Sequence, residues 1–341
     1  MTTRTAAGLA VAALAILLGG SACTPAVTPA VTLRPRAHPV TFEVSKIAAA
    51  PSVIAVLTTK GQVLAKQGSL DGPWISEYTG ASQLAVASDS THGPLIAVLT
   101  TKGQVLAKQG SLTTPWTSEY TGASQLAVAS DSTHGPLIAV RTRAGRLLAK
   151  QGRLTAPWTS EYARVSQIAV ASDSRHGPLI AVRTRAGRLL AKQGRLNGPW
   201  TSVYTRVVRF AVASDSRHGP LVAVLGPAGQ ALAKQGRLNA PWTSEYTGVS
   251  QLAAASDGDN GLLLAVLTTT RGTVLVKQGQ LNGSWISQYA KASNLAVATD
   301  PASGPLIAVL TGTGQALVKQ GSLDGPWISE HTGPARVNLS G

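Results

Sequence analysis

Short apolar runs separated by turn residues fill most of the chain. In one stretch the runs are SQLAVAS (82–88), LIAVLTT (95–101), QVLAKQGSL (104–112) and WTSEY (116–120). None of them has a helical period of 3.6 residues, and their β-branched content favours strands. The intervening KG predicts a two-residue hairpin turn with a positive φ. Alternate residues of the last run are expected on opposite faces, Trp116 and Tyr120 on one and Glu119 on the other.

This pattern of four short strands recurs seven times. All seven tryptophans follow one another at spacings of 42, 42, 42, 42, 43 and 42 residues. The lysines of a KQG motif recur at the same spacings: Lys66, Lys108, Lys150, Lys192, Lys234, Lys277 and Lys319. The one extra residue falls in LTTTRGT (267–273), where the first copy has LTTKGQ, so we expect a hairpin turn that tolerates an insertion.

Four strands in about 42 residues, repeated seven times, predict an all-β, seven-bladed β-propeller. From Ser45 to Asn338 the chain has 294 residues, which is seven times 42. An open β-solenoid is the alternative. The segments SKIAAAP (45–51) and PARVNLS (334–340) resemble the same strand, so we expect one of them to complete a blade opened at the other end of the chain. The alternating alanines of LAVAS suit a crowded inner strand, and the tryptophans suit the wedge between blades.

The N-terminal region predicts export. Residues 1–22 contain an apolar run and small residues before a cleavage point, as in a signal peptide. Cys23, the single cysteine, resembles the lipid-carrying residue of a bacterial lipobox, which places the protein on the outer face of the cell membrane; simple cleavage after Ala22 and secretion is the alternative. Residues 23–40 are rich in Pro and Thr and predict a tether. Residues 41–341 form the expected propeller.

The repeated phrase carries a family resemblance. GQVLAKQGSLDGPWISEY (61–78) resembles the repeats of secreted actinobacterial β-propeller proteins, which are similar to tectonin and tachylectin-like lectin propellers. The resemblance implies a binding module for carbohydrate or cell-envelope material. The repeated aromatic residues are the candidate ligand contacts: Trp74, Trp116, Trp158, Trp200, Trp242, Trp285, Trp327, Tyr78, Tyr120, Tyr162, Tyr204, Tyr246 and Tyr289.

Other repeated polar residues have structural explanations. An Asp-x-x-His pair, as at Asp89 and His92, has the composition of a metal or acid–base site, but Asp before Gly-Pro is typical of a turn, which we favour. The recurring glutamates are expected on a solvated strand face: Glu77, Glu119, Glu161, Glu245 and Glu330. The KQG lysines are expected to point outward. We predict no metal site and no cofactor.

The positive charge is concentrated in one region. The whole chain has a formal net charge of +15, and between Arg141 and Arg237 there are 14 Arg and 3 Lys against 3 carboxylates, a net charge of +14. The candidate anionic-partner patch is Arg141, Arg143, Arg146, Arg183, Arg185 and Arg188. Such an arc suits a teichoic-type acid, an acidic glycan or phospholipid headgroups. Nucleic acid is not expected, because aromatic side chains for base stacking are not interleaved with the arginines.

The sequence thus favours an exported, lipid-anchored monomer that binds envelope or extracellular glycans through multivalent weak contacts. The alternative is a scaffold that docks an acidic protein partner on the arginine arc. Membrane contact is expected through the lipid anchor only. We expect no enzymatic activity, because near-identical units give repeated shallow sites rather than one convergent catalytic site.

Overall fold

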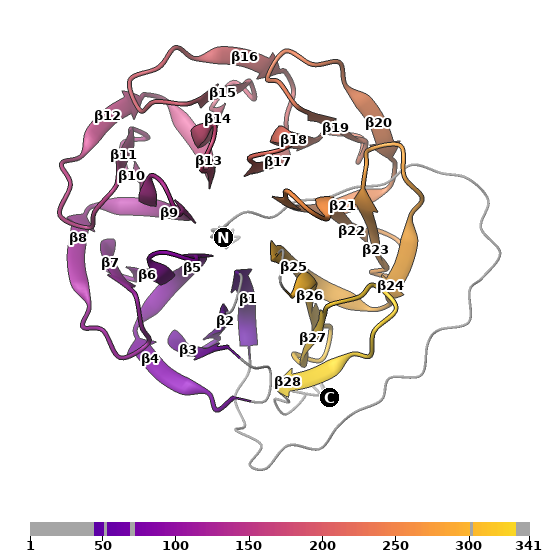
Figure 1. The fold of residues 1–341 in the computed structure, drawn as a ribbon, viewed down its shortest axis with the longest axis horizontal. Coiled ribbons are helices and arrows are strands. Elements are labelled where there is room, and N and C mark those ends of the chain that lie inside the picture. Colours follow the sequence, from indigo (N-terminus) through magenta and orange to yellow (C-terminus); the bar gives the residue numbers. More distant parts are fainter. Residues whose placement is uncertain (1–43, 51–52, 69–71, 301–302, 332–341) are drawn as a thin grey trace, which may run out of the picture.

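The computed structural model describes residues 44–50, 53–68, 72–300 and 303–331, and everything below concerns these residues. They form seven four-stranded antiparallel sheets arranged around a central axis (Figure 1). Each sheet consists of four consecutive strands, with the first strand innermost. The predicted seven-bladed propeller is therefore confirmed. None of the described residues lie in a helix long and apolar enough to cross a membrane. The predicted signal peptide, Cys23 and the tether lie outside the described residues.

The strands of blades 1 to 4 are β1 (Val44–Ala50), β2 (Val53–Thr58), β3 (Gln62–Gln67), β4 (Ile75–Thr79), β5 (Ala81–Asp89), β6 (Gly93–Thr100), β7 (Gln104–Gln109), β8 (Thr117–Thr121), β9 (Ala123–Asp131), β10 (Gly135–Thr142), β11 (Leu147–Gln151), β12 (Thr159–Tyr162), β13 (Val165–Asp173), β14 (Gly177–Thr184), β15 (Leu189–Gln193) and β16 (Thr201–Tyr204). Those of blades 5 to 7 are β17 (Arg209–Asp215), β18 (Gly219–Leu225), β19 (Ala231–Gln235), β20 (Thr243–Tyr246), β21 (Val249–Asp257), β22 (Gly261–Thr268), β23 (Val274–Gly279), β24 (Ile286–Tyr289), β25 (Ala292–Asp300), β26 (Gly304–Thr311), β27 (Ala316–Gln320) and β28 (Ile328–His331).

The up-and-down strand order gives the disc two different faces. The aspartate face holds the turn between the first and second strands of each blade, such as Ser90–His92, and the loop between the third and fourth. The connector face holds the turn between the second and third strands, such as Thr101–Gly103, and the connection from each blade to the next. Because Val44 pairs with Thr58 at the start of β1, the described chain enters the propeller at the connector face.

The ring closes without an exchanged strand among the described residues. β1 is the inner strand of blade 1, and blade 7 is complete in β25–β28, so no blade combines strands from the two ends. The expectation that one terminal segment completes a blade opened at the other end is wrong for these residues, and 334–340 lie outside them. Blades 7 and 1 are instead joined by a Lys66–Glu330 ion pair and by Trp74, whose Nε1 donates to the Glu330 carbonyl oxygen at 3.0 Å.

The apolar core lies between neighbouring blades. Each joint buries alternate side chains of two sheets, as where Leu57 and Val63 of blade 1 pack with Leu84 and Ile96 of blade 2. Burial of apolar area is the main stabilising force in such a joint. The inner strands supply small residues, and their Ala, Ser and Val side chains line a channel of about 150 Å³ on the axis. The alternating alanines therefore lie where the sequence placed them.

Candidate functional site

A buried ion pair crosses most of the joints between blades. The KQG lysine of one blade pairs with the glutamate of the preceding blade, as in Lys277 and Glu245, whose Nζ and Oε2 are 2.5 Å apart. The equivalent pairs are Lys66–Glu330, Lys108–Glu77, Lys150–Glu119 and Lys192–Glu161. Burial raises the pKa of Glu119, Glu161 and Glu245, and the opposing effect of the paired lysine is smaller.

Two sequence predictions are thereby wrong: the glutamates do not lie on a solvated face, and the KQG lysines do not point outward. The reason is a β-bulge. Val105 pairs with Tyr120 and Leu106 with Ser118, so Glu119 is the extra residue of its strand. A bulge re-aims a side chain and breaks the two-residue alternation on which the prediction rested. The lysines are buried because their strand, the third of each blade, faces the neighbouring sheet; Lys66 and Lys319 are each 2% exposed.

The repeated aromatic residues complete the same joints. The lysine Nζ lies 4.4–5.1 Å from the centroid of the tryptophan ring in its own blade, a cation–π distance. Trp116 Nε1 donates to the Glu77 carbonyl oxygen of the preceding blade at 3.0 Å. Tyr78 packs edge-on against Trp116 with ring centroids 5.6 Å apart. Most of these aromatic rings are half-buried, and Trp327 is 2% exposed. Their predicted role in ligand binding stays a prediction.

The Asp-x-x-His pairs form turns, as the sequence predicted. Asp89 Oδ1 accepts hydrogen bonds from the backbone N–H groups of Thr91 and His92 at 2.8 and 2.7 Å, and His92 Nδ1 lies 3.0 Å away. Asp89 Oδ2 accepts a hydrogen bond from the Ser130 hydroxyl of the next blade. Burial raises the pKa of Asp89, but these hydrogen bonds from Ser130, His92 and Thr91 outweigh it and hold the pKa below its usual value.

The six arginines of the predicted patch lie around the turns of the connector face in blades 3 and 4. Arg143, Arg146, Arg185 and Arg188 are exposed. Arg141 and Arg183 are half-buried at the ends of β10 and β14, and Arg183 Nη1 donates to the Ser166 hydroxyl at 3.2 Å. The structure therefore brings the six side chains to one face.

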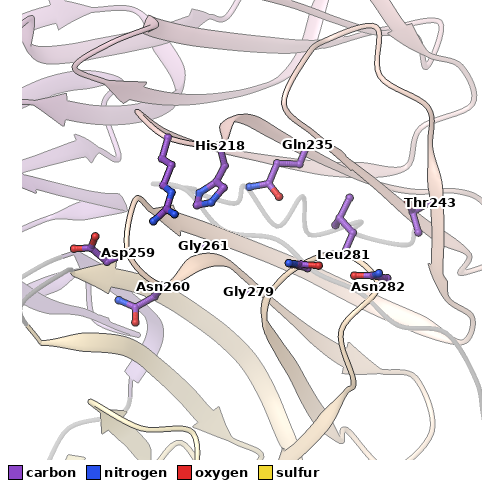
Figure 2. Close-up of a pocket in the computed structure, with 11 residues that line it drawn as sticks. His218, Gln235, Thr243, Asp259, Asn260, Gly261, Gly279, Leu281 and Asn282 are labelled. Atoms are coloured by element: carbon purple, nitrogen blue, oxygen red, sulfur yellow. The ribbon is translucent and has the colours of Figure 1, made fainter.

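A polar groove lies on the opposite, aspartate face, at the joint between blades 5 and 6. Its cavity volume is about 610 Å³. Blade 5 lines it with Arg217 and His218, in the turn after β17, and with Gln235 at the end of β19. Blade 6 lines it with Asp259 and Asn260, in the turn after β21, and with the residues at and beyond the end of β23: Gly279, Gln280, Leu281 and Asn282. Figure 2 shows the side chains of His218, Gln235 and Asn282 around the groove. Sequence reasoning missed this site, although the departure of SDGDNGL (256–262) from the SDSTHGP pattern marked the place.

The groove offers hydrogen-bonding groups of several kinds. His218 Nδ1 lies 3.1 Å from Asp215 Oδ1, so the ring is oriented and its Nε2 is available to a ligand. Asn260 is held by hydrogen bonds to Asp257, and the exposed Asp259 carboxylate adds acceptors. The Gln235 side-chain nitrogen is buried without a hydrogen-bond partner among the described residues. A buried donor of this kind is normally satisfied by water or a ligand.

No protein-family model and no curated protein matches the chain. Solved structures share its fold. The BP39L lectin from Burkholderia pseudomallei matches with a TM-score of 0.61 at 15% identity, over 84% of this chain and 99% of the lectin. BBS1N, solved in complex with ARL6DN, matches with a TM-score of 0.57 at 15% identity, over 80% and 88%. An ancestral GH74 enzyme matches with a TM-score of 0.58 at 12% identity, over 83% of this chain and 48% of the enzyme.

The comparison with the GH74 enzyme corrects one prediction. The sequence analysis expected no enzymatic activity, on the argument that repeated blades give only repeated shallow sites. That expectation is wrong as a deduction from the architecture, because an enzyme shares this fold over most of the present chain. The propeller fold is therefore shared by a lectin and by an enzyme, and the fold alone does not decide between these two classes of protein.

Proposed function

We propose that this propeller binds carbohydrate and that the groove between blades 5 and 6 is its principal site. The observation that supports the proposal most is the lining of the groove. Amide, imidazole, guanidinium and carboxylate groups surround about 610 Å³, together with the apolar Leu281. Donors and acceptors fixed around a concave surface suit the hydroxyl groups of a sugar. The shared fold with the BP39L lectin supports the same class of ligand.

Multivalency follows from the repeated joints. Blades 4 and 5 carry Asn197 and Asn239 where blade 6 has Asn282, so parts of the groove recur around the ring. The turn after the first strand of each blade differs between copies, because earlier copies have His where blade 6 has Asn260. We propose that these joints add weaker contacts, which raise the avidity for a polymeric glycan without further strong sites.

The first test is binding of the full chain to an array of glycans at about 0.1 M and about 1 M salt, between which the screening length falls from ~10 to ~3 Å. We expect binding to a defined glycan that survives high salt. Asn282→Ala is expected to weaken it about 5- to 20-fold, the loss of one or two hydrogen bonds. Asn197→Ala is the matched control, since Asn197 has the same place in blade 4 and does not line the groove. Equal effects of the two substitutions would contradict the assignment.

Export and anchoring belong to the same proposal. We propose that residues 1–22 are removed on export and that Cys23 carries a lipid, which places the glycan-binding domain at the outer face of the membrane. Membrane fractionation at about 1 M salt, which screens electrostatic attraction to the bilayer, tests this: the native chain should sediment with membranes and Cys23→Ser should be released. Docking of an acidic protein partner stays the alternative prediction, and its binding should collapse at high salt, unlike that of a neutral glycan.

A further inference from the structure

The connector face carries many cations and none of the described carboxylates. The described aspartates lie in turns and loops of the aspartate face, and the described glutamates lie inside the joints. The exposed cations of the connector face are Lys60, Lys102, Arg143, Arg146, Arg164, Arg185, Arg188, Arg206, Arg271 and Lys291. They extend beyond the six arginines named from the sequence and belong to most of the blades. One face of the disc is therefore positively charged without local compensation.

Several of these cations occupy strained backbone positions. The described non-glycine residues with a positive φ are all cations of this face: Arg164 (59°), Arg206 (60°), Arg271 (73°) and Lys291 (63°). The first two and the last lie in connections between blades, where other copies use Gly80, Gly122 and Gly248, also with positive φ. An L-residue in the left-handed region costs free energy that glycine avoids. Such strain is found where a side chain serves a function.

Mutual repulsion adds to this cost. Burial lowers the pKa of Arg141, and the positive charge of Arg185 lowers it further. The Arg141 Nε is also buried without a hydrogen-bond partner among the described residues. The backbone brings other cations together, since the Arg185 N–H donates to the Arg164 carbonyl oxygen at 3.0 Å and the Lys291 N–H donates to that of Arg271 at 3.0 Å. Nothing within the described fold compensates these charges, which an anionic partner would do.

We propose that the connector face docks on the surface of an anionic lipid bilayer. The cations lie on turns and connections around the ring rather than in a cleft, which suits an extended charged surface. Val44 and His331 both lie at this face, so the 43 residues before Val44 enter the propeller from the side that we assign to the bilayer. Val208, 42% exposed, is the exposed large apolar side chain of this face among the described residues. A single valine offers too little apolar area for insertion into the bilayer. Electrostatic attraction therefore provides the binding energy.

This docking is independent of the glycan groove and adds a second membrane contact to the predicted lipid anchor. Strands of up to nine residues separate the two faces, about 30 Å at ~3.3 Å per residue. That exceeds three screening lengths at physiological salt, so the faces act separately. With the connector face on the bilayer, the groove on the aspartate face points away from the membrane.

The test compares the full chain carrying Cys23→Ser, so that the predicted lipid anchor does not contribute, with two triple variants made in the same Cys23→Ser chain, by sedimentation with vesicles. Arg164→Gly, Arg206→Gly and Lys291→Gly together remove three cations from the connector face and introduce the residue that other copies have there. The matched control, Arg153→Ser with Arg195→Ser and Arg237→Ser, removes three exposed cations from the aspartate face and introduces the serine of blades 2 and 7. Vesicles of phosphatidylcholine, with and without phosphatidylglycerol, are used at about 0.1 M and 1 M salt.

We expect the Cys23→Ser chain and the control to bind the phosphatidylglycerol vesicles equally at low salt. The connector-face variant should bind roughly 100-fold more weakly, since each cation near an anionic surface contributes about fivefold. At high salt, each chain should bind the vesicles with and without phosphatidylglycerol equally. Equal binding to both vesicle types at low salt would overturn the proposal, and so would equal losses in the two variants. Binding to a soluble polyanion such as polyphosphate but not to the vesicles would overturn it in favour of an acidic polymer or protein.

Discussion

At the residue scale, most of the repeated phrase is explained by the joints between blades. Lysine, glutamate and tryptophan meet at five joints, and two joints carry natural substitutions. Gln288 takes the place of glutamate opposite Lys319, whose Nζ lies 2.8 Å from Gln288 Oε1. Val203 takes it opposite Lys234, which keeps the hydrogen bond to the Leu238 carbonyl oxygen. Burial lowers the pKa of both lysines, and the opposing effect of the Asp324 carboxylate on Lys319 is smaller.

Removing a glutamate should destabilise the ring because it leaves a buried lysine uncompensated. We expect Glu77→Ala to lower the free energy of unfolding by about 3–5 kcal/mol. Glu77→Gln should cost less, since the Gln288–Lys319 pair shows that an amide fits this place. Urea unfolding measures both variants. Similar small losses for both would mean that the Lys108–Glu77 pair contributes little.

The joint without a carboxylate predicts a pH dependence. Because the pKa of Lys234 is lower in the folded state than the usual 10.5, the unfolded state binds more protons as the pH approaches 10.5. Lys234 therefore makes the native chain more stable as the pH rises through this window. Val203→Glu supplies the missing partner and should stabilise the protein by roughly 1–2 kcal/mol near neutral pH.

The stabilising effect of Val203→Glu should shrink as the pH rises toward 10.5, because Lys234 of the native chain then loses the charge that the glutamate would compensate. Urea unfolding of the native and variant chains at pH 7 and at about pH 10 measures the difference. A constant difference would show that Lys234 does not titrate in this way.

At the element scale, two backbone features decide where side chains point. The β-bulge in the fourth strand turns each glutamate into the joint. The positive φ of the blade connections favours glycine, yet Arg164, Arg206 and Lys291 occupy three of these places. Local backbone conformation, rather than strand alternation alone, therefore controls which residues face solvent.

Substituting these cations by glycine should stabilise the protein. We expect Arg164→Gly to raise the free energy of unfolding by about 0.5–1 kcal/mol, the relief of left-handed strain less the larger chain entropy of glycine. The reverse change in an equivalent connection, Gly122→Arg, should lower it by a similar amount. The midpoint of urea unfolding checks both. A loss of stability in Arg164→Gly would show that the arginine side chain stabilises its own connection.

The fold was predictable because strand-length apolar runs and turn residues recur at a fixed period. The turn function of Asp89 and the hairpin around Gly103 were also visible in the sequence, since each depends on local chemistry. The burial of Glu119 was not, because a bulge depends on the pairing of two strands. The groove was not predicted either, because it is formed by turns and loops of two blades that are about 42 residues apart in the sequence.

At the scale of the whole molecule, repetition and variation have different roles. The repeated residues hold seven sheets in a ring (Figure 1). The positions at which the copies differ distinguish the aspartate face from the connector face. Variation in the turns of blade 6 accompanies the groove of the aspartate face. Added arginines and lysines charge the connector face. We therefore propose glycan recognition and membrane docking on opposite sides of one disc.

We propose that one groove, rather than seven equal sites, provides the main glycan contact. Calorimetric titration of the full chain with a short glycan identified on the array tests it most directly, because it gives the number of sites as well as the affinity. We predict one tighter site per chain, whose affinity falls about 5- to 20-fold in Asn282→Ala and is unchanged in Asn197→Ala. Seven equal sites, or a tight site unaffected by Asn282→Ala, would contradict the account.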